Sequence, residues 1–433
     1  MRIHARQQAA ALAAVCLLLA AGPSPAATQI PQPLRLDDAL EWAQQYNPAV
    51  RAARIRIERR SGEVTDADVP VPSNPRLELE AGRRRQPQRS STDIGIRISQ
   101  EFWIAGQGGL RERAARDTLE AARGDYDFLV ASVRARTRAA FLSVLVAEEA
   151  VATAERVVDV NRRLSAYARK RLEAGAGTRI ETNAADIGHQ RARALLAEAR
   201  DQATRARLQL KDRLAIDPSR RLAIAGDIGF EDLTLPDRDT LLARAIRRRG
   251  DLDAAAARVA AAGEQLSLAR RRLVPNLTVF GFYREEAGGR GDGGADITGG
   301  GVGFELPLLD RHAGDREIAS AELAAARLDQ DTLQREVRLQ VLSGISAYRG
   351  ARESADALGS AVLEAAEQTL ELTRRSFAAG KVGAPAITSA QNNLIDVRRD
   401  YLDALNALIA AGTDLERATG GLVVMATGEN DDE

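Results

Sequence analysis

The chain has 433 residues and a balanced charge, with 61 Lys and Arg against 61 Asp and Glu. No basic excess favours binding to nucleic acid. Aromatic residues make up only 4% of the chain, which is low for a β-rich enzyme and usual for long helices rich in Ala, Leu, Arg and Glu.

The segment 1–27 has the pattern of a secretory signal peptide: a basic start, an apolar run at 9–21, and small residues suited to cleavage after Ala26 or Ala27. A lipoprotein would instead need cleavage just before Cys16, which would leave a very short apolar core. Cleavage at the later site leaves a mature chain without cysteine, so we expect an exported protein without disulfides.

The rest of the chain predicts one plan of elements, used twice. The first repeat, 28–235, predicts a helix at 36–67, strands at 76–83 and 92–102, a helix of about seventy residues ending at Gly175, and a return helix to Ile216. The second repeat, 236–420, predicts a helix at 240–272, strands at 276–284 and 296–306, a long helix ending at Gly380, and a return helix to Ala418. An acidic, flexible tail at 421–433 follows.

Proline spacing and internal similarity support this plan. No proline lies between Pro87 and Pro218, which permits very long helices because proline breaks helix interiors. The pattern Leu-x3-Val-Arg at Leu129 recurs at Leu333, an offset of 333 − 129 = 204 residues. We interpret the order and spacing of such pairs as an internal duplication.

The predicted strands alternate in polarity. Ile94, Ile96 and Ile98 share one face, while Asp93 and Arg97 share the other. A strand between lipid and water has this pattern, and so does a half-buried hairpin of a soluble protein. Four strands cannot close a barrel, and open edges cannot face lipid. Two chains would give eight strands and a filled interior, whereas three would give twelve strands and a water-filled lumen, so a conduit favours the trimer.

Several motifs together resemble TolC-type outer membrane factors, the outer membrane efflux protein family. They are the Asn47-Pro48-Ala49-Val50 segment, the Asn74-Pro75 start of the first strand, the glycine-rich helix tips, the tandem repeat, and the closing segment 415–420. The segment 74–80 resembles members paired with heavy-metal or cation efflux pumps.

The resemblance implies a mainly α fold with a small β part: a trimer with a 12-stranded outer-membrane β-barrel continuous with a long periplasmic α-helical barrel. It implies a passive exit duct of a tripartite efflux system for drugs or metal cations. A homotrimer would lie in outer-membrane lipid and meet a periplasmic membrane-fusion adaptor and an inner-membrane pump of the resistance-nodulation-division type. The duct of a type I protein secretion system is the alternative within the family.

The resemblance also suggests roles for the helix tips. Tip residues that would meet the adaptor are Gly175, Gly177, Thr178, Gly380, Val382 and Gly383. The alternative is that these glycines only cap helices. Some family members carry acidic gate residues just beyond the second tip, where this chain has Ala386 and Ser389. The remaining candidates for a closed aperture are Glu181, Asp186 and Asp396, each of which could also be an ordinary solvated helix position.

The turn between the first two strands is basic, with Arg83, Arg84 and Arg85. If the strands cross the outer membrane, we expect these arginines to contact lipopolysaccharide phosphates, because guanidinium suits bidentate phosphate binding. The alternative is a solvated hairpin loop. The corresponding loop of the second repeat, 288–294, is glycine-rich.

Two other classes of protein fit the sequence less well. An enzyme would need a catalytic motif, yet His189 and His312 lie in different repeats and no nucleophile elbow, phosphate loop or His-Glu metal motif is present. We therefore predict no enzyme, no cofactor and no resident metal. A soluble periplasmic coiled-coil adaptor would have one long helical hairpin between β-rich domains, whereas this chain predicts two hairpins and four separate strands.

Overall fold

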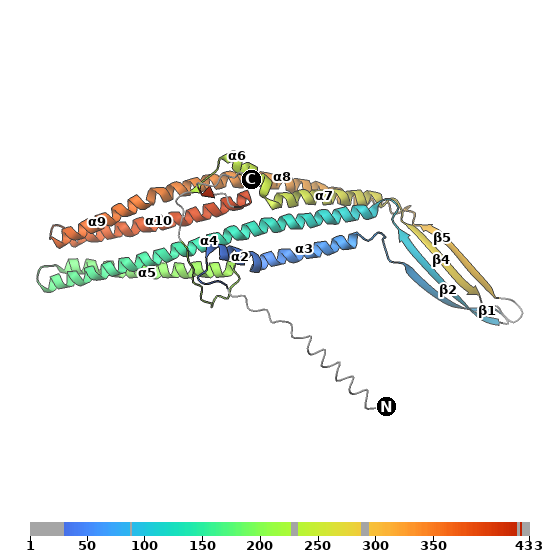
Figure 1. Ribbon diagram of the computed structural model, residues 1–433, viewed down its shortest axis with the longest axis horizontal. Coiled ribbons are helices and arrows are strands. Elements are labelled where there is room, and N and C mark those ends of the chain that lie inside the picture. Colours follow the sequence, from blue (N-terminus) through green and yellow to red (C-terminus); the bar gives the residue numbers. More distant parts are fainter. Residues whose placement is uncertain (1–29, 87–88, 227–232, 287–293, 422–424, 427–433) are drawn as a thin grey trace, which may run out of the picture.

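A computed structural model of the chain describes residues 30–86, 89–226, 233–286, 294–421 and 425–426. The predicted signal peptide, nearly all of the acidic tail and nearly all of the glycine-rich loop lie outside these ranges. The molecule is elongated, with a long helical bundle and a sheet that projects from one end of it at an angle (Figure 1).

The elements follow the predicted order. Those of the first half are α2 (Leu36–Tyr46), α3 (Pro48–Ala67), β1 (Arg76–Gln86), β2 (Arg89–Phe102), α4 (Gln107–Glu173) and α5 (Arg179–Arg213). Those of the second half are β3 (Leu233–Thr234), α6 (Arg238–Arg248), α7 (Gly250–Arg271), β4 (Leu277–Glu286), β5 (Ala295–Phe304), α8 (Ala313–Leu358), α9 (Ser360–Ala378), α10 (Ala384–Thr419) and β6 (Met425–Ala426). The fold is mainly helical with a small antiparallel β part, as predicted.

The predicted helix at 36–67 is in fact two helices, α2 and α3. Pro48 cannot donate a backbone hydrogen bond, and the side chain of Asn47 accepts one from the N–H of Ala49 at 2.9 Å, so a new helix starts there. The predicted helix at 240–272 also breaks, at Arg249 between α6 and α7, where the backbone is extended but neither a proline nor a side-chain cap is present.

The long helices differ between the halves. Helix α4 is continuous over 67 residues, which corresponds to roughly 100 Å. The prediction of a single long helix that ends at Gly380 is wrong. Gly359 adopts an extended conformation and separates α8, of 46 residues, from α9, of 19 residues. Glycine disfavours the helix interior because it loses the most backbone entropy there.

The sheet has the strand order β1-β2-β4-β5, with every neighbouring pair antiparallel. Its register aligns Leu79 with Ile96, Ile96 with Tyr283, and Tyr283 with Thr298. The central pair β2–β4 joins the two halves of the chain, while β1 and β5 form the edges.

The two largest hydrophobic clusters lie along the helices. The first joins α2, α3, α4 and α5 through residues such as Phe141 and Leu210, and the second joins α4, α6, α8 and α10 through residues such as Val341 and Leu408. The β3 and β6 strands pair, so the segment between the repeats meets the C-terminal residues. In the described part of the chain, no helix combines the length and the apolar character needed to cross a membrane.

Candidate functional site

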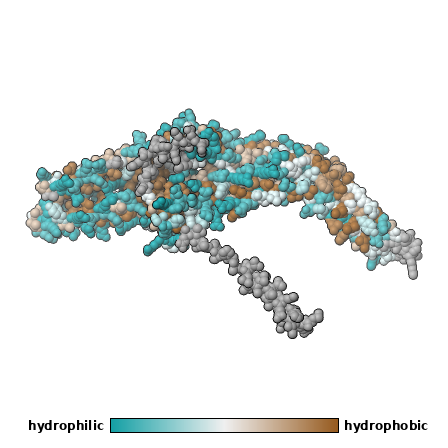
Figure 2. Space-filling model, in the orientation of Figure 1, coloured by the Kyte–Doolittle hydropathy of each residue, from teal (hydrophilic) through white to brown (hydrophobic). Residues whose placement is uncertain are grey.

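One face of the sheet is apolar and exposed. Leu79 on β1 and Ile94 on β2 leave 73% and 57% of their surface uncovered. The same face carries exposed Leu77, Ile96, Ile98, Val279, Tyr283, Val302 and Phe304. Figure 2 shows hydrophobic residues gathered on the sheet and at its junction with the bundle, whereas the bundle surface is mostly hydrophilic. A contiguous apolar face of this kind marks a surface for lipid or another chain.

The opposite face of the sheet is polar. Arg84 lies 3.0 Å from Asp93 and 2.8 Å from Glu286, so charges of opposite sign pair across three strands. Longer pairs join Arg97 to Glu78 at 3.9 Å and Arg284 to Glu80 at 3.6 Å. The charges suit contact with water, as the alternation predicts.

Two phenylalanines, Phe280 and Phe282, also lie on this polar face, where their rings are partly covered by their neighbours. A methyl group added at Gly301 would lie 2.8 Å from the ring of Phe280, and one added at Gly299 would lie 2.7 Å from the ring of Phe282. The rings therefore lie over the glycines of β5. The guanidinium of Arg97 packs against both rings, at 5.1 Å from Phe280 and 5.9 Å from Phe282.

The two helix tips, at the end of the bundle away from the sheet, have the same geometry (Figure 1). Gly175 and Gly380 each have a φ of +71°, the left-handed conformation that glycine tolerates best. In the first tip, the N–H of Gly175 donates to Leu172 O at 3.0 Å and that of Ala176 to Arg171 O at 2.8 Å. Gly380 and the residue after it make the equivalent bonds, so both tips close helices in a Schellman arrangement.

The remaining tip residues start the return helices. Thr178 caps α5: its hydroxyl accepts from the N–H of Glu181 at 3.2 Å, and the Glu181 carboxylate accepts from the N–H of Thr178 at 3.0 Å. Gly177 has Arg171 close by, and Gly383 caps α10. All six predicted contact residues thus lie at or beside the two turns, and their contact with an adaptor stays a prediction.

A small apolar cluster packs the second tip against α4, the helix that leads to the first tip. Phe377 on α9 is 3% exposed and packs with Leu164 on α4, Ile387 on α10 and Val382 in the second tip. Its ring also meets Tyr167 edge-on, with centroids 5.8 Å apart. Phe377 was not among the predicted contact residues, although a single phenylalanine directly before a helix tip in a chain poor in aromatics was a usable signal.

The three candidate aperture residues are not brought together. Glu181 belongs to the cap of α5, Asp186 lies on the α5 side that faces α4, and Asp396 is exposed on α10. The hydroxyl of Ser165 donates to Asp186, and Arg169 lies 2.9 Å from it. These bonds, that from Ser165 first, hold the pKa of Asp186 below its usual range. A gating role for any of the three stays a prediction.

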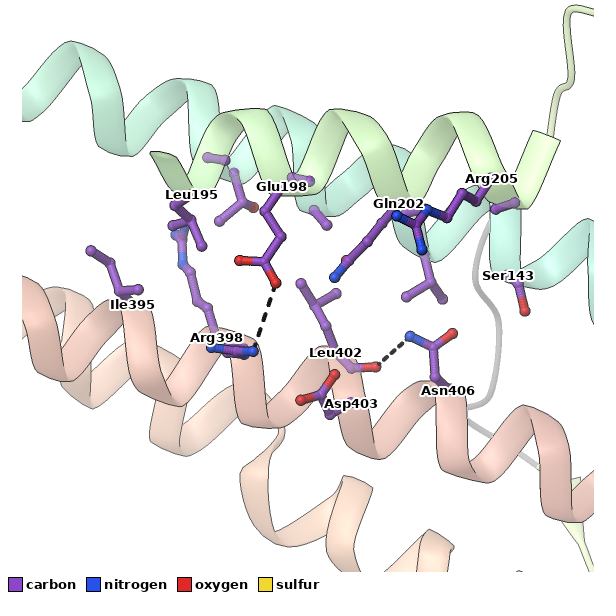
Figure 3. Close-up of a pocket in the computed structure, with 18 of the residues that line it drawn as sticks. Ser143, Leu195, Glu198, Gln202, Arg205, Ile395, Arg398, Leu402, Asp403 and Asn406 are labelled. Carbon is purple, nitrogen blue, oxygen red and sulfur yellow. Dashed lines mark hydrogen bonds and ion pairs between the residues drawn. The ribbon is translucent and has the colours of Figure 1, made fainter. Parts of the chain in front are cut away.

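A cavity of about 370 Å³ lies in the bundle and is lined by residues of α4, α5 and α10 (Figure 3). Glu198 on α5 points across it toward α10, where it meets Arg399 at 3.8 Å. Asn406 donates to Leu402 O at 3.1 Å within α10. The α4 side of the lining includes small apolar residues such as Ala150 and Ala154. The cavity separates the first helical hairpin from the second, with one long ion pair across it.

The three arginines of the first turn are divided between the two faces of the sheet. Arg83 and Arg85 lie two and four positions beyond Ala81 on β1, so they share the apolar face with Ala81 and its partner Ile94. Arg83 pairs in register with Thr92, and Arg85 with Ser90. Arg84 lies on the polar face with Asp93 and Glu286. Strand alternation thus places Arg83 and Arg85 on the apolar face and Arg84 on the polar face.

Comparison with known proteins identifies the family of the chain. The family model for outer membrane efflux proteins matches residues 39–215 and 241–421. The cobalt-zinc-cadmium resistance protein CzcC of Cupriavidus metallidurans is 28% identical over 394 residues, covering 90% of this chain and 90% of that protein. Protein CyaE of Bordetella pertussis is 28% identical over 415 residues, covering 89% and 86%.

The fold has solved counterparts. The crystal structure of the CmeC outer membrane channel of Campylobacter jejuni superimposes with a TM-score of 0.76 at 14% identity, covering 91% of this chain and 87% of that one. At this identity the likeness shows the fold alone. Because the family model covers both halves, the chain belongs to the outer membrane efflux protein family, whose members are non-enzymatic exit ducts of the outer membrane with a periplasmic helical extension.

Proposed function

We propose that three copies of this chain close into one duct that releases divalent transition-metal cations across the outer membrane. The observation that carries the trimer is the unclosed sheet. Its edge strands β1 and β5 run in opposite directions, since each of the three intervening pairings is antiparallel. The β5 edge of one copy can therefore pair antiparallel with the β1 edge of the next, leaving no edge in lipid. Three copies give a lumen lined by the polar face.

Ducts of this family work with a periplasmic adaptor and an inner-membrane pump. We assign the adaptor contact to the two tips, because they are the exposed turns farthest from the sheet, and the pump to the resistance-nodulation-division type. The small cluster around Phe377 supports this assignment, since it packs the second tip against α4, the helix that ends at the first tip.

The proposed substrate class rests on the relatives. CzcC is named for cobalt, zinc and cadmium resistance, and the alignment to it spans 90% of both chains. Among the residues that the structure describes, no group of three or more His, Cys, Asp or Glu side chains could hold a metal ion. A duct only needs to pass cations, because the pump that feeds it selects them.

Deletion of the gene in its own host tests the proposal. We expect the lowest inhibitory concentrations of cobalt, zinc and cadmium to fall several-fold and the cellular content of these metals to rise, with both restored by the wild-type gene. Measurement of sensitivity to organic dyes and antibiotics in the same strains serves as the comparison. Increased sensitivity to organic compounds with unchanged metal tolerance would refute the proposal that the substrates are metal cations, but not the proposal that the chain forms an efflux duct. Unchanged tolerance to both classes would count against efflux by this chain under those conditions.

A further inference from the structure

The apolar face of the sheet has a definite height. It begins at the row formed by Leu277, Phe304 and Phe102 and extends to the row formed by Ile94 and Ala81. On β4 these rows are eight residues apart, from Leu277 to Glu285, which is about 27 Å at about 3.4 Å per residue. Strands tilted by about 40° would rise about 21 Å over that length, which is close to the apolar band of about 25 Å on outer-membrane strands.

Arg83 and Arg85 stand directly beyond this band. They follow Leu77, Leu79 and Ala81 at every second position of β1, so the same face changes from apolar to basic within two residues. Both side chains are exposed, and neither forms an ion pair with the residues that the structure describes. Guanidinium groups at this height lie where the headgroups of the outer leaflet would be.

The neighbouring arginine has other partners. Arg84 points to the opposite face, where Asp93 and Glu286 lie within 3.0 Å of it. The second half of the chain also differs, because its apolar face ends on Glu285 and Asp296, which are acidic. Among the residues that the structure describes, the basic end of the band is therefore confined to β1.

We propose that Arg83 and Arg85 bind phosphate groups on the lipid headgroups of the outer leaflet and thereby fix the depth of the duct in the membrane. The inference rests on the proposed function, because it requires the sheet to cross the outer membrane. Guanidinium binds phosphate oxygens through two parallel hydrogen bonds, which gives stronger and more specific binding than a point charge would. The acidic side chains of Glu285 and Asp296 lie one row closer to the bundle, in register with Ile94, and they repel phosphate on β4 and β5. Each copy therefore has one lipid-phosphate site among its described residues.

Lipid binding to the purified full-length protein tests this proposal. The probes are diphosphorylated lipid A and the same lipid after removal of both phosphates, added to the protein in a neutral detergent; inorganic phosphate at equal concentration is a further probe. The variants are the double substitution Arg83→Gln with Arg85→Gln and, as a control, Arg84→Gln. The dissociation constant is measured for each lipid, together with the temperature at which the trimer dissociates with and without lipid.

We expect the wild type to prefer the phosphorylated lipid and the double variant to lose about 30-fold in affinity for it, which corresponds to about 1 kcal/mol for each arginine near an anionic surface. Arg84→Gln should keep the preference, and inorganic phosphate should reproduce none of the thermal shift. Equal preference in the double variant would overturn the proposal. The proposal would also be overturned if the double variant kept the lipid preference of the wild type while its trimer dissociated at a lower temperature both with and without lipid. The arginines would then act between subunits and not on lipid. The metal tolerance of cells that carry the double variant is measured separately. It shows whether the duct still exports metal cations when lipid binding is lost.

Discussion

Substitution of Arg249 by alanine is expected to cost about 3–5 kcal/mol of folding free energy, because it removes a buried guanidinium and leaves the carboxylate of Asp251, whose side chain is 15% exposed, without its partner. The Arg249 residue is 2% exposed and its guanidinium forms a bidentate pair with Asp251, at 2.6 and 2.9 Å. The same group donates to Gln340 on α8 at 2.7 Å and to the carbonyl of Ala418 on α10 at 3.3 Å, and it packs on the ring of Phe128 on α4 at 4.8 Å. One side chain thus connects the start of α7 to three other helices.

The measurement is the amount of heat-sensitive trimer in the outer-membrane fraction and its dissociation temperature. Arg248→Ala, next in the chain but exposed, is the matched control and should behave as wild type. Arg249→Lys keeps the charge without the planar fork, so we expect an intermediate result. Wild-type trimer from Arg249→Ala would show that the buried network contributes little.

Substitution of Gly124 by alanine is expected to destabilise the fold by about 1–3 kcal/mol through overpacking, although alanine favours helices. Helices α4 and α7 cross here in close contact. A methyl group at Gly124 would lie 2.4 Å from the carbonyl oxygen of Gly250 and 2.9 Å from the backbone nitrogen of Ala254. Both atoms belong to the backbone, so no side-chain rotation relieves the contact and the helices must separate.

The chain offers matched controls for this change. Gly62 in α3 and Gly263 in α7 are also helical glycines, and nothing lies within 4 Å of a methyl group added at either one. Their alanine variants should be unchanged or more stable, by up to about 1 kcal/mol. The comparison is made by chemical denaturation in one detergent. If Gly124→Ala proves as stable as the two controls, the close crossing of α4 and α7 is not a constraint on the fold.

The arrangement of elements was largely predictable because it depends on local patterns. Helical periodicity, the long intervals between prolines and the alternation at Ile94, Ile96 and Ile98 placed the long helices and all four strands of the sheet. The helix break at Asn47-Pro48 was visible in the sequence, since asparagine followed by proline is a helix start, and it was overlooked. The break at Gly359 was not predictable, because isolated glycines such as Gly124 occur within continuous helices of the same chain.

The candidate site was predictable only where a turn defines it. Gly175 and Gly380 were found because a left-handed residue after a long helix calls for glycine. Thr178 and Glu181 fit the T-x-x-E capping pattern, which explains Glu181 without a gate and could have been recognised. The role of Arg249 could not be predicted, because its partner Gln340 is 91 residues away and sits beside it only once the helices pack.

The central claim is that β5 of one copy pairs with β1 of the next to close a trimer. Disulfide cross-linking in isolated outer membranes tests it most directly, with one cysteine at Val302 on β5 combined in turn with single cysteines at positions 76–82 of β1. The only native cysteine, Cys16, lies in the predicted signal peptide. Val302 shares the apolar face with positions 77, 79 and 81, so we predict that a covalent trimer forms after oxidation only with cysteines among these three. Positions 76, 78, 80 and 82 and the single-cysteine controls should not link. Failure of every combination to link subunits of a membrane-inserted protein would contradict the closed trimer.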